Sequence, residues 1–216
     1  GNNFRWKGNQ MNTNATIVKQ APEIDTNQPE NYETATFALG WFWGPDSRFG
    51  SLEGVIRTRV GYTGGTLPDP TYHNLGKHTE SLQIDYDPNI ISYEDLLQIF
   101  WENHNPTRRA WSTQYKAVIF YHNDEQREAA ESSKTQLENE MGKTVQTGIQ
   151  RLSQFYVAED YHQKYYLRNS SQFMKQFTLN MPDEDEFRNS TAAARVNGFL
   201  GGSGIYQQVK REINSL

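Results

Sequence analysis

The 216-residue sequence contains no cysteine. This absence excludes disulfides, thiolate–metal sites and a cysteine nucleophile in the chain as written. It does not identify the compartment, and we assign the protein to the cytoplasm as an expectation. The sequence also lacks an apolar run approaching the roughly 20 residues that a membrane helix needs. We therefore expect no membrane partner.

Charge and histidine spacing argue against nucleic-acid-binding proteins and metalloproteins. The formal net charge is −5 and the lysines and arginines are scattered, so no basic stripe predicts a nucleic-acid partner. The five histidines show neither H-x-x-x-H nor H-E-x-x-H spacing, and no Gly-rich nucleotide motif is present. We expect no metal site and no bound cofactor.

The length suits one good-sized domain, and aromatic residues, at 13% of the chain, must supply much of its core. Residues 1–30 are polar, without periodicity, and predict a flexible N-terminal tail. Residues 198–216 begin with GFLGGSG and predict a flexible C-terminal tail. The predicted domain spans 31–197.

Within that domain, strands and helices alternate irregularly. This pattern predicts one α/β (α+β) domain in two layers, with a mixed sheet covered by helices. Period-two and helical patterns predict strands over 34–39, 55–60, 79–85, 115–121 and 144–149, and helices over 42–52, 92–103, 123–141, 159–167 and 183–195.

The stretch Gly40-Trp41-Phe42-Trp43-Gly44 lies where the first strand meets the first helix. Free backbone N–H groups and the helix dipole favour an anion or a thiolate at such a junction. The alternative is three core aromatics at a tight turn, and this stretch alone favours that alternative.

Glu80 follows the Gly-rich stretch 61–76 at the start of a strand. A buried carboxyl there has a raised pKa and can act as an acid, although a solvated Glu at a strand start is the plainer interpretation. Tyr62, Tyr72 and Tyr115 carry hydroxyls that can hold an oxyanion, or they simply replace Phe in an aromatic core.

Taken together, the segments resemble the A-type peptide methionine sulfoxide reductases from about Phe37 to about Leu167. The family hallmark G-C-F-W-G corresponds to residues 40–44. The other matching motifs, in order, are GYTGG (61–65), GKHTE (76–80), YDP (86–88), ISY (91–93), NHNPT (103–107), TQY (113–115) and AEDYHQKY (158–165).

The resemblance implies a ferredoxin-like core and the reduction of methionine (S)-sulfoxide, free or in proteins. It implies that residue 41 is the nucleophile position, that Glu80 protonates the sulfoxide oxygen, and that Tyr62 and Tyr115 hydrogen-bond it. Phe42 and Trp43 become walls for the methyl group. The other residues that we assign to substrate binding are Tyr72 and His78. Thioredoxin or a similar external thiol would be the reductant, and the protein would be a monomer.

The sequence departs from this pattern because residue 41 is tryptophan. An indole cannot form a sulfenic acid, so we expect the chain as written to be inactive and to require Cys or selenocysteine at position 41. Three interpretations stay open. The chain is a pseudo-enzyme that binds methionine sulfoxide or a similar ligand, Trp41 stands for a UGA-encoded selenocysteine, or Trp41 is an engineered substitution.

Overall fold

The computed structural model describes residues 21–214. The strands are β1 (Glu33–Leu39), β2 (Val55–Thr63), β3 (Thr79–Tyr86), β4 (Ala117–Tyr121), β5 (Gly148–Arg151) and β6 (Tyr156–Val157). The α-helices are α1 (Glu23–Thr26), α2 (Trp43–Gly50), α3 (Tyr93–Glu102), α4 (Asp124–Met141), α5 (Tyr165–Arg168), α6 (Ser171–Asn180), α7 (Glu184–Arg188), α8 (Thr191–Leu200) and α9 (Tyr206–Asn214). Two short 3-10 helices are η1 (Thr113–Tyr115) and η2 (Asp160–His162).

The strands form one six-stranded sheet in the order β5-β4-β1-β3-β2-β6. β1 is antiparallel to β3 and β4, β2 is antiparallel to β3 and β6, and β4 and β5 are parallel. The run β1-α2-β2-β3-α3-β4 with sheet order β4-β1-β3-β2 is a ferredoxin-like arrangement. The predicted fold class, one α+β domain with a mixed sheet and covering helices, is confirmed.

Alternation in β1 explains how the main core forms. Ala35, Phe37 and Leu39 point to one face of the sheet and are buried in the main hydrophobic cluster. Phe37 packs against Phe49 of α2 and Phe100 of α3, with ring centroids 5.7 and 4.9 Å away. The two crossover helices therefore bury their apolar sides on one face of the sheet and fix where α2 begins.

Side-chain caps fix the starts of two helices. Ser92 and Asp95 form a capping box before α3, and the Asn123 side chain accepts a hydrogen bond from the N–H of Gln126 before α4. Gly142 ends α4 in the left-handed region. The predicted helices 92–103 and 123–141 are confirmed in place.

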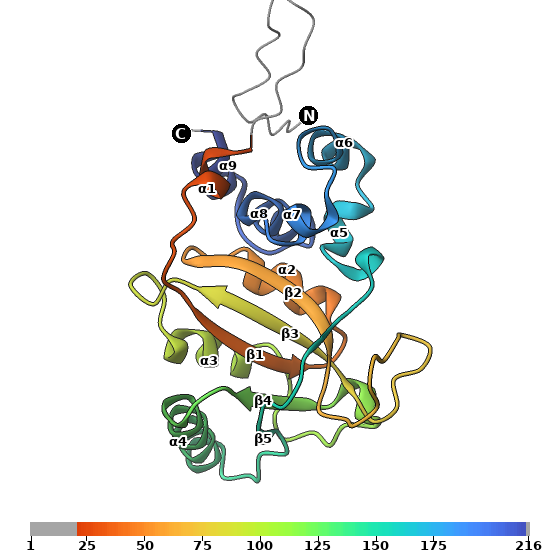
Figure 1. Cartoon of the computed structure of the whole chain (residues 1–216). Coiled ribbons are helices and arrows are strands. Elements are labelled where there is room, and N and C mark those ends of the chain that lie inside the picture. The colour runs from red at the N-terminus through yellow and green to blue at the C-terminus, as the bar shows by residue number, and fades with distance from the viewer. Residues whose placement is uncertain (1–20, 215–216) are drawn as a thin grey trace, which may run out of the picture.

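Helices α5 to α9 gather at one end of the molecule, beside β2, while α4 lies at the other end beside β4 and β5 (Figure 1). They enclose a second hydrophobic cluster that includes Phe177, Phe187 and Val196. Helix α8 packs along α2, so this cluster stands directly behind the helix that follows position 41. No helix within the described part of the chain has the length and apolarity needed to cross a membrane.

Both predicted tails need correction where the structure describes them. Val209 and Ile213 of α9 are buried in the second cluster, because a four-residue spacing puts them on one face of the helix. Asp25 of α1 accepts hydrogen bonds from the N–H groups of Thr191 and Ala192 at the start of α8. Residues 1–20 of the predicted N-terminal tail lie outside the described residues.

The predicted helix over 159–167 is wrong. The segment contains η2 and α5, separated by Lys164 in the left-handed region at φ 50°. The fully buried Lys164 side chain donates to the carbonyl oxygens of Thr58 and Arg188, and its N–H donates to Asp46 Oδ2 at 3.1 Å. These long-range contacts interrupt the helical path. The predicted helix over 183–195 is likewise two helices, α7 and α8.

The predicted strand over 144–149 begins later, at Gly148, and Tyr115 lies in η1 rather than in a strand. Thr147 Oγ1 is 2.8 Å from His104 Nε2, and Lys134 Nζ donates to the Thr147 carbonyl oxygen. The hydroxyl and carbonyl groups of Thr147 thus have hydrogen-bond partners outside the sheet, and the strand begins only at Gly148. The structure also contains β6, α6 and α9, for which no element was predicted.

Candidate functional site

Position 41 lies in the turn between β1 and α2. Gly40, at φ +95°, ends the strand in a conformation that favours glycine. The Trp41 side chain is 50% exposed, and its ring centroid lies 4.8 Å from that of Trp43. Together with Gly40, Trp111 and Tyr115 it lines a hollow of about 560 Å³, which we call the position-41 pocket. The residue at position 41 is therefore accessible.

Glu80 is held directly beside this turn. Its side chain is 1% exposed, and Oε1 accepts a hydrogen bond of 3.3 Å from the Phe42 N–H. Oε2 accepts a 2.7 Å bond from Gln114 Nε2. Burial raises the pKa of the Glu80 carboxyl above its ordinary value, while these two hydrogen bonds act in the opposite direction. Of the two interpretations of Glu80 from the sequence, the structure shows the buried carboxyl, and the assignment of Glu80 as the acid stays a prediction.

Tyr62 and Tyr72 share a second carboxylate, Glu159. The buried Tyr62 hydroxyl donates to Glu159 Oε1 at 2.9 Å, and the Tyr72 N–H donates to Oε2 at 3.1 Å. Burial raises the pKa of Tyr62, and the charges of Glu159 and Glu80 raise it further. For Glu159, burial alone would raise the pKa, but hydrogen bonds from its own N–H, the Tyr72 N–H and Tyr62 lower it. Tyr62 therefore bonds to a carboxylate in this structure.

Tyr115 completes the tyrosine set. It ends η1, and its ring centroid lies 5.4 Å from that of Trp111. Burial raises the pKa of Tyr115, and so do the charge of Glu80 and the nearby Tyr72 hydroxyl. The structure thus brings Tyr62 and Tyr115 within electrostatic reach of Glu80, and it places Tyr115 near Tyr72 and beside position 41.

Trp43 is oriented by two residues that the sequence reasoning did not single out. Its indole lies 3.5 Å from the Tyr165 ring at an interplanar angle of 4°, and its Nε1–H donates to His162 Nδ1 at 3.1 Å. The buried Phe42 ring meets the same imidazole edge-on at 5.1 Å. The motif AEDYHQKY supplied Glu159, His162 and Tyr165, but no local pattern indicated that they meet residues 42 and 43.

His162 has one ring nitrogen without a partner. Because Nδ1 accepts from Trp43, Nε2 carries the hydrogen of the neutral ring. That buried nitrogen has no hydrogen-bond partner among the described residues. Burial lowers the pKa of His162, against the opposing effect of Glu159. The neutral ring is therefore favoured as the acceptor for Trp43.

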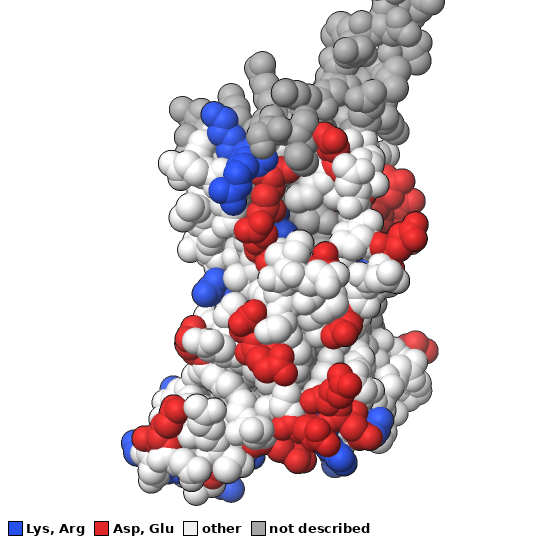
Figure 2. All heavy atoms as spheres, turned by 90° about the vertical axis from the view of Figure 1, so that its left-hand side faces the viewer, with Lys and Arg blue, Asp and Glu red and all other residues white. Residues whose placement is uncertain are grey.

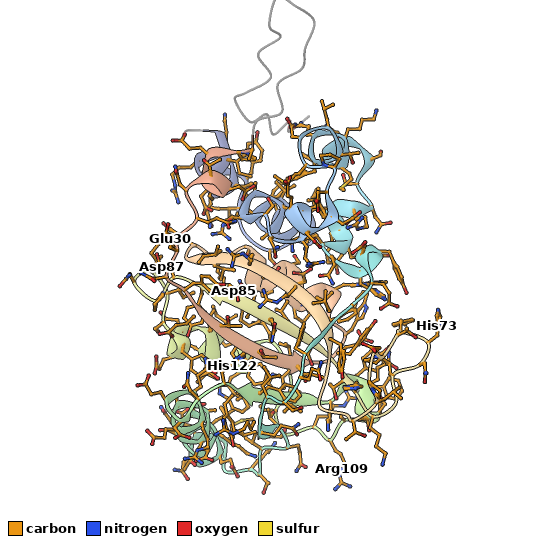
Figure 3. All side chains as sticks on the ribbon, in the orientation of Figure 1. Glu30, His73, Asp85, Asp87, Arg109 and His122 are labelled. Carbon is orange, nitrogen blue, oxygen red and sulfur yellow. The ribbon has the colours of Figure 1, made fainter. Side chains whose placement is uncertain are left out.

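His78 has both ring nitrogens engaged within the Gly-rich loop. The Gly65 N–H donates to Nδ1 at 3.1 Å, and Nε2 lies 2.8 Å from the Leu67 carbonyl oxygen. The ring is buried against Tyr156. The structure gives His78 the role of holding the loop, and its predicted contact with substrate stays a prediction. His73 lies farther along this loop, at one side of the molecule (Figure 3). Within residues 21–214, no three His, Asp or Glu side chains converge as metal ligands.

Position 41 thus lies on a tight turn, with the buried Glu80 carboxyl bonded to the next residue and an open hollow lined by Trp111 and Tyr115 on its exposed side. The profile of the peptide methionine sulfoxide reductase family matches residues 33–195. The chain belongs to this family.

Several relatives illustrate the similarity. The chain is 40% identical over 189 residues to a peptide methionine sulfoxide reductase of Drosophila melanogaster, covering 85% of this chain and 74% of that protein. It is 48% identical over 145 residues to one from Methanococcoides burtonii, covering 62% of this chain and 95% of that protein. The structure of methionine sulfoxide reductase A of Corynebacterium diphtheriae matches with a TM-score of 0.58 and 30% identity, over 65% of this chain and 76% of that one.

The reduced form of Mxr1 from Saccharomyces cerevisiae matches with a TM-score of 0.61 and 26% identity. This similarity covers 66% of our chain and 88% of Mxr1. All of these relatives support the family assignment, while the tryptophan at position 41 stays the open feature of this chain.

Proposed function

We propose that the position-41 pocket is built to reduce methionine (S)-sulfoxide, free or in proteins, with residue 41 as the nucleophile position. The observation that carries the proposal is the buried Glu80 carboxyl, bonded to the Phe42 N–H immediately after position 41. A proton donor is thereby held beside the place where a nucleophile would act. Family membership supports the same reaction.

The proposed step needs a thiolate or selenolate at position 41. It attacks the sulfoxide sulfur, and Glu80 supplies a proton to the oxygen. This attack forms a bond between residue 41 and the methionine sulfur, and the oxygen, with a second proton from solvent, leaves as water with the electron pair of the sulfur–oxygen bond. Water then attacks residue 41 and returns a proton to solvent. The bond between residue 41 and the methionine sulfur breaks with its electron pair on that sulfur, which becomes the sulfide, and residue 41 becomes a sulfenic or selenenic acid. Phe42 and Trp43 would enclose the methyl group, with Tyr62 and Tyr115 near the oxygen.

Reductant must come from outside the chain, because the sequence contains no cysteine to resolve the sulfenic acid. We propose thioredoxin or a similar dithiol. One thiol condenses with the sulfenic acid and releases water, and the second releases residue 41 as a thiol and leaves the reductant as a disulfide. A monomer and a cytoplasmic location remain predictions, and light scattering of the purified protein tests the first.

The test compares the chain with Trp41→Cys and Trp41→Ser, each supplied with dithiothreitol and separate epimers of methionine sulfoxide. We expect the Cys variant to reduce the S epimer and the other two proteins to reduce neither. The Ser variant removes the indole without adding a thiol. It therefore distinguishes the effect of opening the pocket to substrate from the effect of supplying a nucleophile. An inactive, folded Cys variant would reject the reductase proposal.

A second candidate function is binding without turnover. It is favoured by the position-41 pocket, which stays open to solvent with Trp41 at its margin. The chain as written would then bind a methionine sulfoxide peptide, and calorimetric titration should show saturable binding. A flat titration with both epimers would reject this alternative.

A further inference from the structure

A second hollow adjoins the position-41 pocket. It has a volume of about 390 Å³, lies between residues 104–118 and 146–150, and we call it the basic groove. Gly40, Trp111 and Tyr115 line both hollows. A chain bound with one side chain at position 41 therefore has a direct path into the basic groove.

The charge of this groove is opposite to that of the whole protein. Its charged lining residues are Arg108, Arg109 and Lys116, and no Asp or Glu lines it. Among the salt bridges of residues 21–214 none involves these three cations. Elsewhere, acidic side chains spread over the face that carries α3 and α4 (Figure 2). The groove is thus a local cationic site on a chain of net charge −5.

The loop that carries the arginines is held in place. The Asn105 side chain accepts from the N–H of Thr107, and the Gln146 N–H donates to the Pro106 carbonyl oxygen at 2.6 Å. These bonds tie the loop to the strand β5 side of the groove. Arg109 projects from the lower edge of the molecule in Figure 3, where its guanidinium can meet an incoming chain.

Trp111 forms the wall between the two hollows and is 82% exposed. An exposed tryptophan packed beside Tyr115 offers an apolar surface for a bound main chain. Apolar contact at the wall and positive charge beyond it are the features that bind an extended peptide with acidic side chains.

We propose that the basic groove binds Asp or Glu side chains that flank methionine sulfoxide in a protein substrate. This inference rests on the proposed function, since it needs the sulfoxide at position 41. An extended peptide advances about 3.3 Å per residue, so side chains within a few residues of the sulfoxide reach the groove. Protein substrates with acidic neighbours are then preferred over neutral ones.

The experiment measures the dissociation constants of two five-residue peptides for the chain as it exists. Both have a central methionine (S)-sulfoxide, one with four flanking Glu and one with four flanking Gln. Because exposed ion pairs contribute little to affinity, we expect the Glu peptide to bind roughly two- to fivefold more tightly at low salt. At about 1 M salt, where the screening length is about 3 Å, the ratio should approach one.

Substitutions test which residues cause the preference for the Glu peptide. Arg108→Gln with Arg109→Gln should abolish the Glu preference, whereas Lys175→Gln, an exposed cation on α6, should retain it. Equal dissociation constants for the two peptides would overturn the proposal that the basic groove binds acidic side chains, and they would leave the proposed function intact. Absence of binding by either peptide, with an inactive Trp41→Cys variant, would reject both. A Glu preference with an inactive Cys variant would reject only the reductase.

The reductant is the rival occupant of the groove. In the Trp41→Cys background, turnover with dithiothreitol and with thioredoxin separates it from the peptide. If the double Gln variant slows only the thioredoxin-dependent reaction and keeps the Glu preference, the groove serves the reductant and the peptide proposal is wrong.

Discussion

Glu80 shows how burial and hydrogen bonding act against each other at one carboxyl. Burial raises its pKa, while Gln114 and the Phe42 N–H favour the charged form. The net raised pKa keeps a proton available at higher pH than for an exposed Glu. At the residue scale, the proposed acid role therefore rests on the surroundings of Glu80 and not on its residue type.

The first prediction replaces this acid. In the Trp41→Cys background, Glu80→Gln keeps the shape and removes the proton, so we expect turnover of methionine sulfoxide to fall by about 10²–10⁴-fold. The Glu80 enzyme should lose rate as pH rises through the raised pKa, and the Gln variant should lack that limb. Rate profiles from pH 5 to 9 check this, with circular dichroism as the folding control. Unchanged turnover would remove Glu80 from the mechanism.

The second prediction concerns the orientation of Trp43. His162→Leu removes the acceptor for its indole N–H, whereas His162→Gln offers a replacement acceptor. Trp43 is partly buried, so losing the partner of its indole N–H costs about 1 kcal/mol, the lower end of the range for a buried donor, and we expect roughly fivefold weakening of methionine sulfoxide binding in the Leu variant. Calorimetry should show partial recovery in the Gln variant. Equal affinities for the unsubstituted protein and the Leu and Gln variants would contradict a role for His162 in orienting Trp43.

At the scale of elements, α2 depends on α8. Ser47 Oγ donates to the Gly198 carbonyl oxygen, and the buried Arg195 side chain donates to the carbonyl oxygen at the end of α2. A Cβ at Gly198 would lie 2.7 Å from Ser51 Cβ and 2.9 Å from the Ser47 carbonyl oxygen. Both neighbours belong to α2 or its C-cap, so the helices cannot keep their spacing with a larger residue there.

The third prediction follows from that contact. Gly198→Ala should lower the free energy of unfolding by about 1–3 kcal/mol, the usual range for overpacking. It should also slow the Trp41→Cys enzyme, because α2 follows the nucleophile position. Urea unfolding and turnover check both effects. Gly148→Ala, whose added Cβ would have its nearest neighbour at 3.7 Å, is the matched control. Equal stability of the two variants would show that α8 does not constrain α2.

For the whole molecule, the buried His162 and the partly buried His104 and His122 link stability to pH. Burial lowers the pKa of His104 and His162, and burial together with the charge of Arg59 lowers that of His122, which lies on the sheet in Figure 3. A lowered pKa means that the unfolded chain binds more protons than the folded chain below the ordinary value of 6.5. Stability from these groups is therefore present above pH 6.5 and is lost as pH falls.

The fourth prediction is an acid-sensitive fold. Urea midpoints should be similar at pH 8 and 7 and should decrease steadily from pH 6.5 to 5, before most carboxylates titrate. His122→Asn should reduce that slope, while Lys175→Gln, a change at an exposed cation on α6, should leave it unaltered. Midpoints that stay constant down to pH 5 would show that these three histidines do not control acid stability.

Local sequence patterns were sufficient for much of the scaffold. A short apolar run indicated β1, and a period-two pattern indicated β3, although all eight residues of β3 are buried and not only one face. Side-chain caps fix the starts of α3 and α4, and the order of motifs led to the family. These features depend on residues within a few positions of one another, where periodicity and capping act directly. The same local rules missed α9, whose polar composition hid two buried residues on one face.

The site itself required long-range packing. Glu80 meets partners 38 and 34 positions away, and Trp43 meets His162 across 119 positions. Lys164 takes a left-handed conformation while its side chain bonds to carbonyl groups of two distant segments. The residue types near position 41 can be read directly from the sequence. Their convergence in space cannot be predicted from local patterns, because strand order and helix docking bring together groups that lie far apart in the sequence.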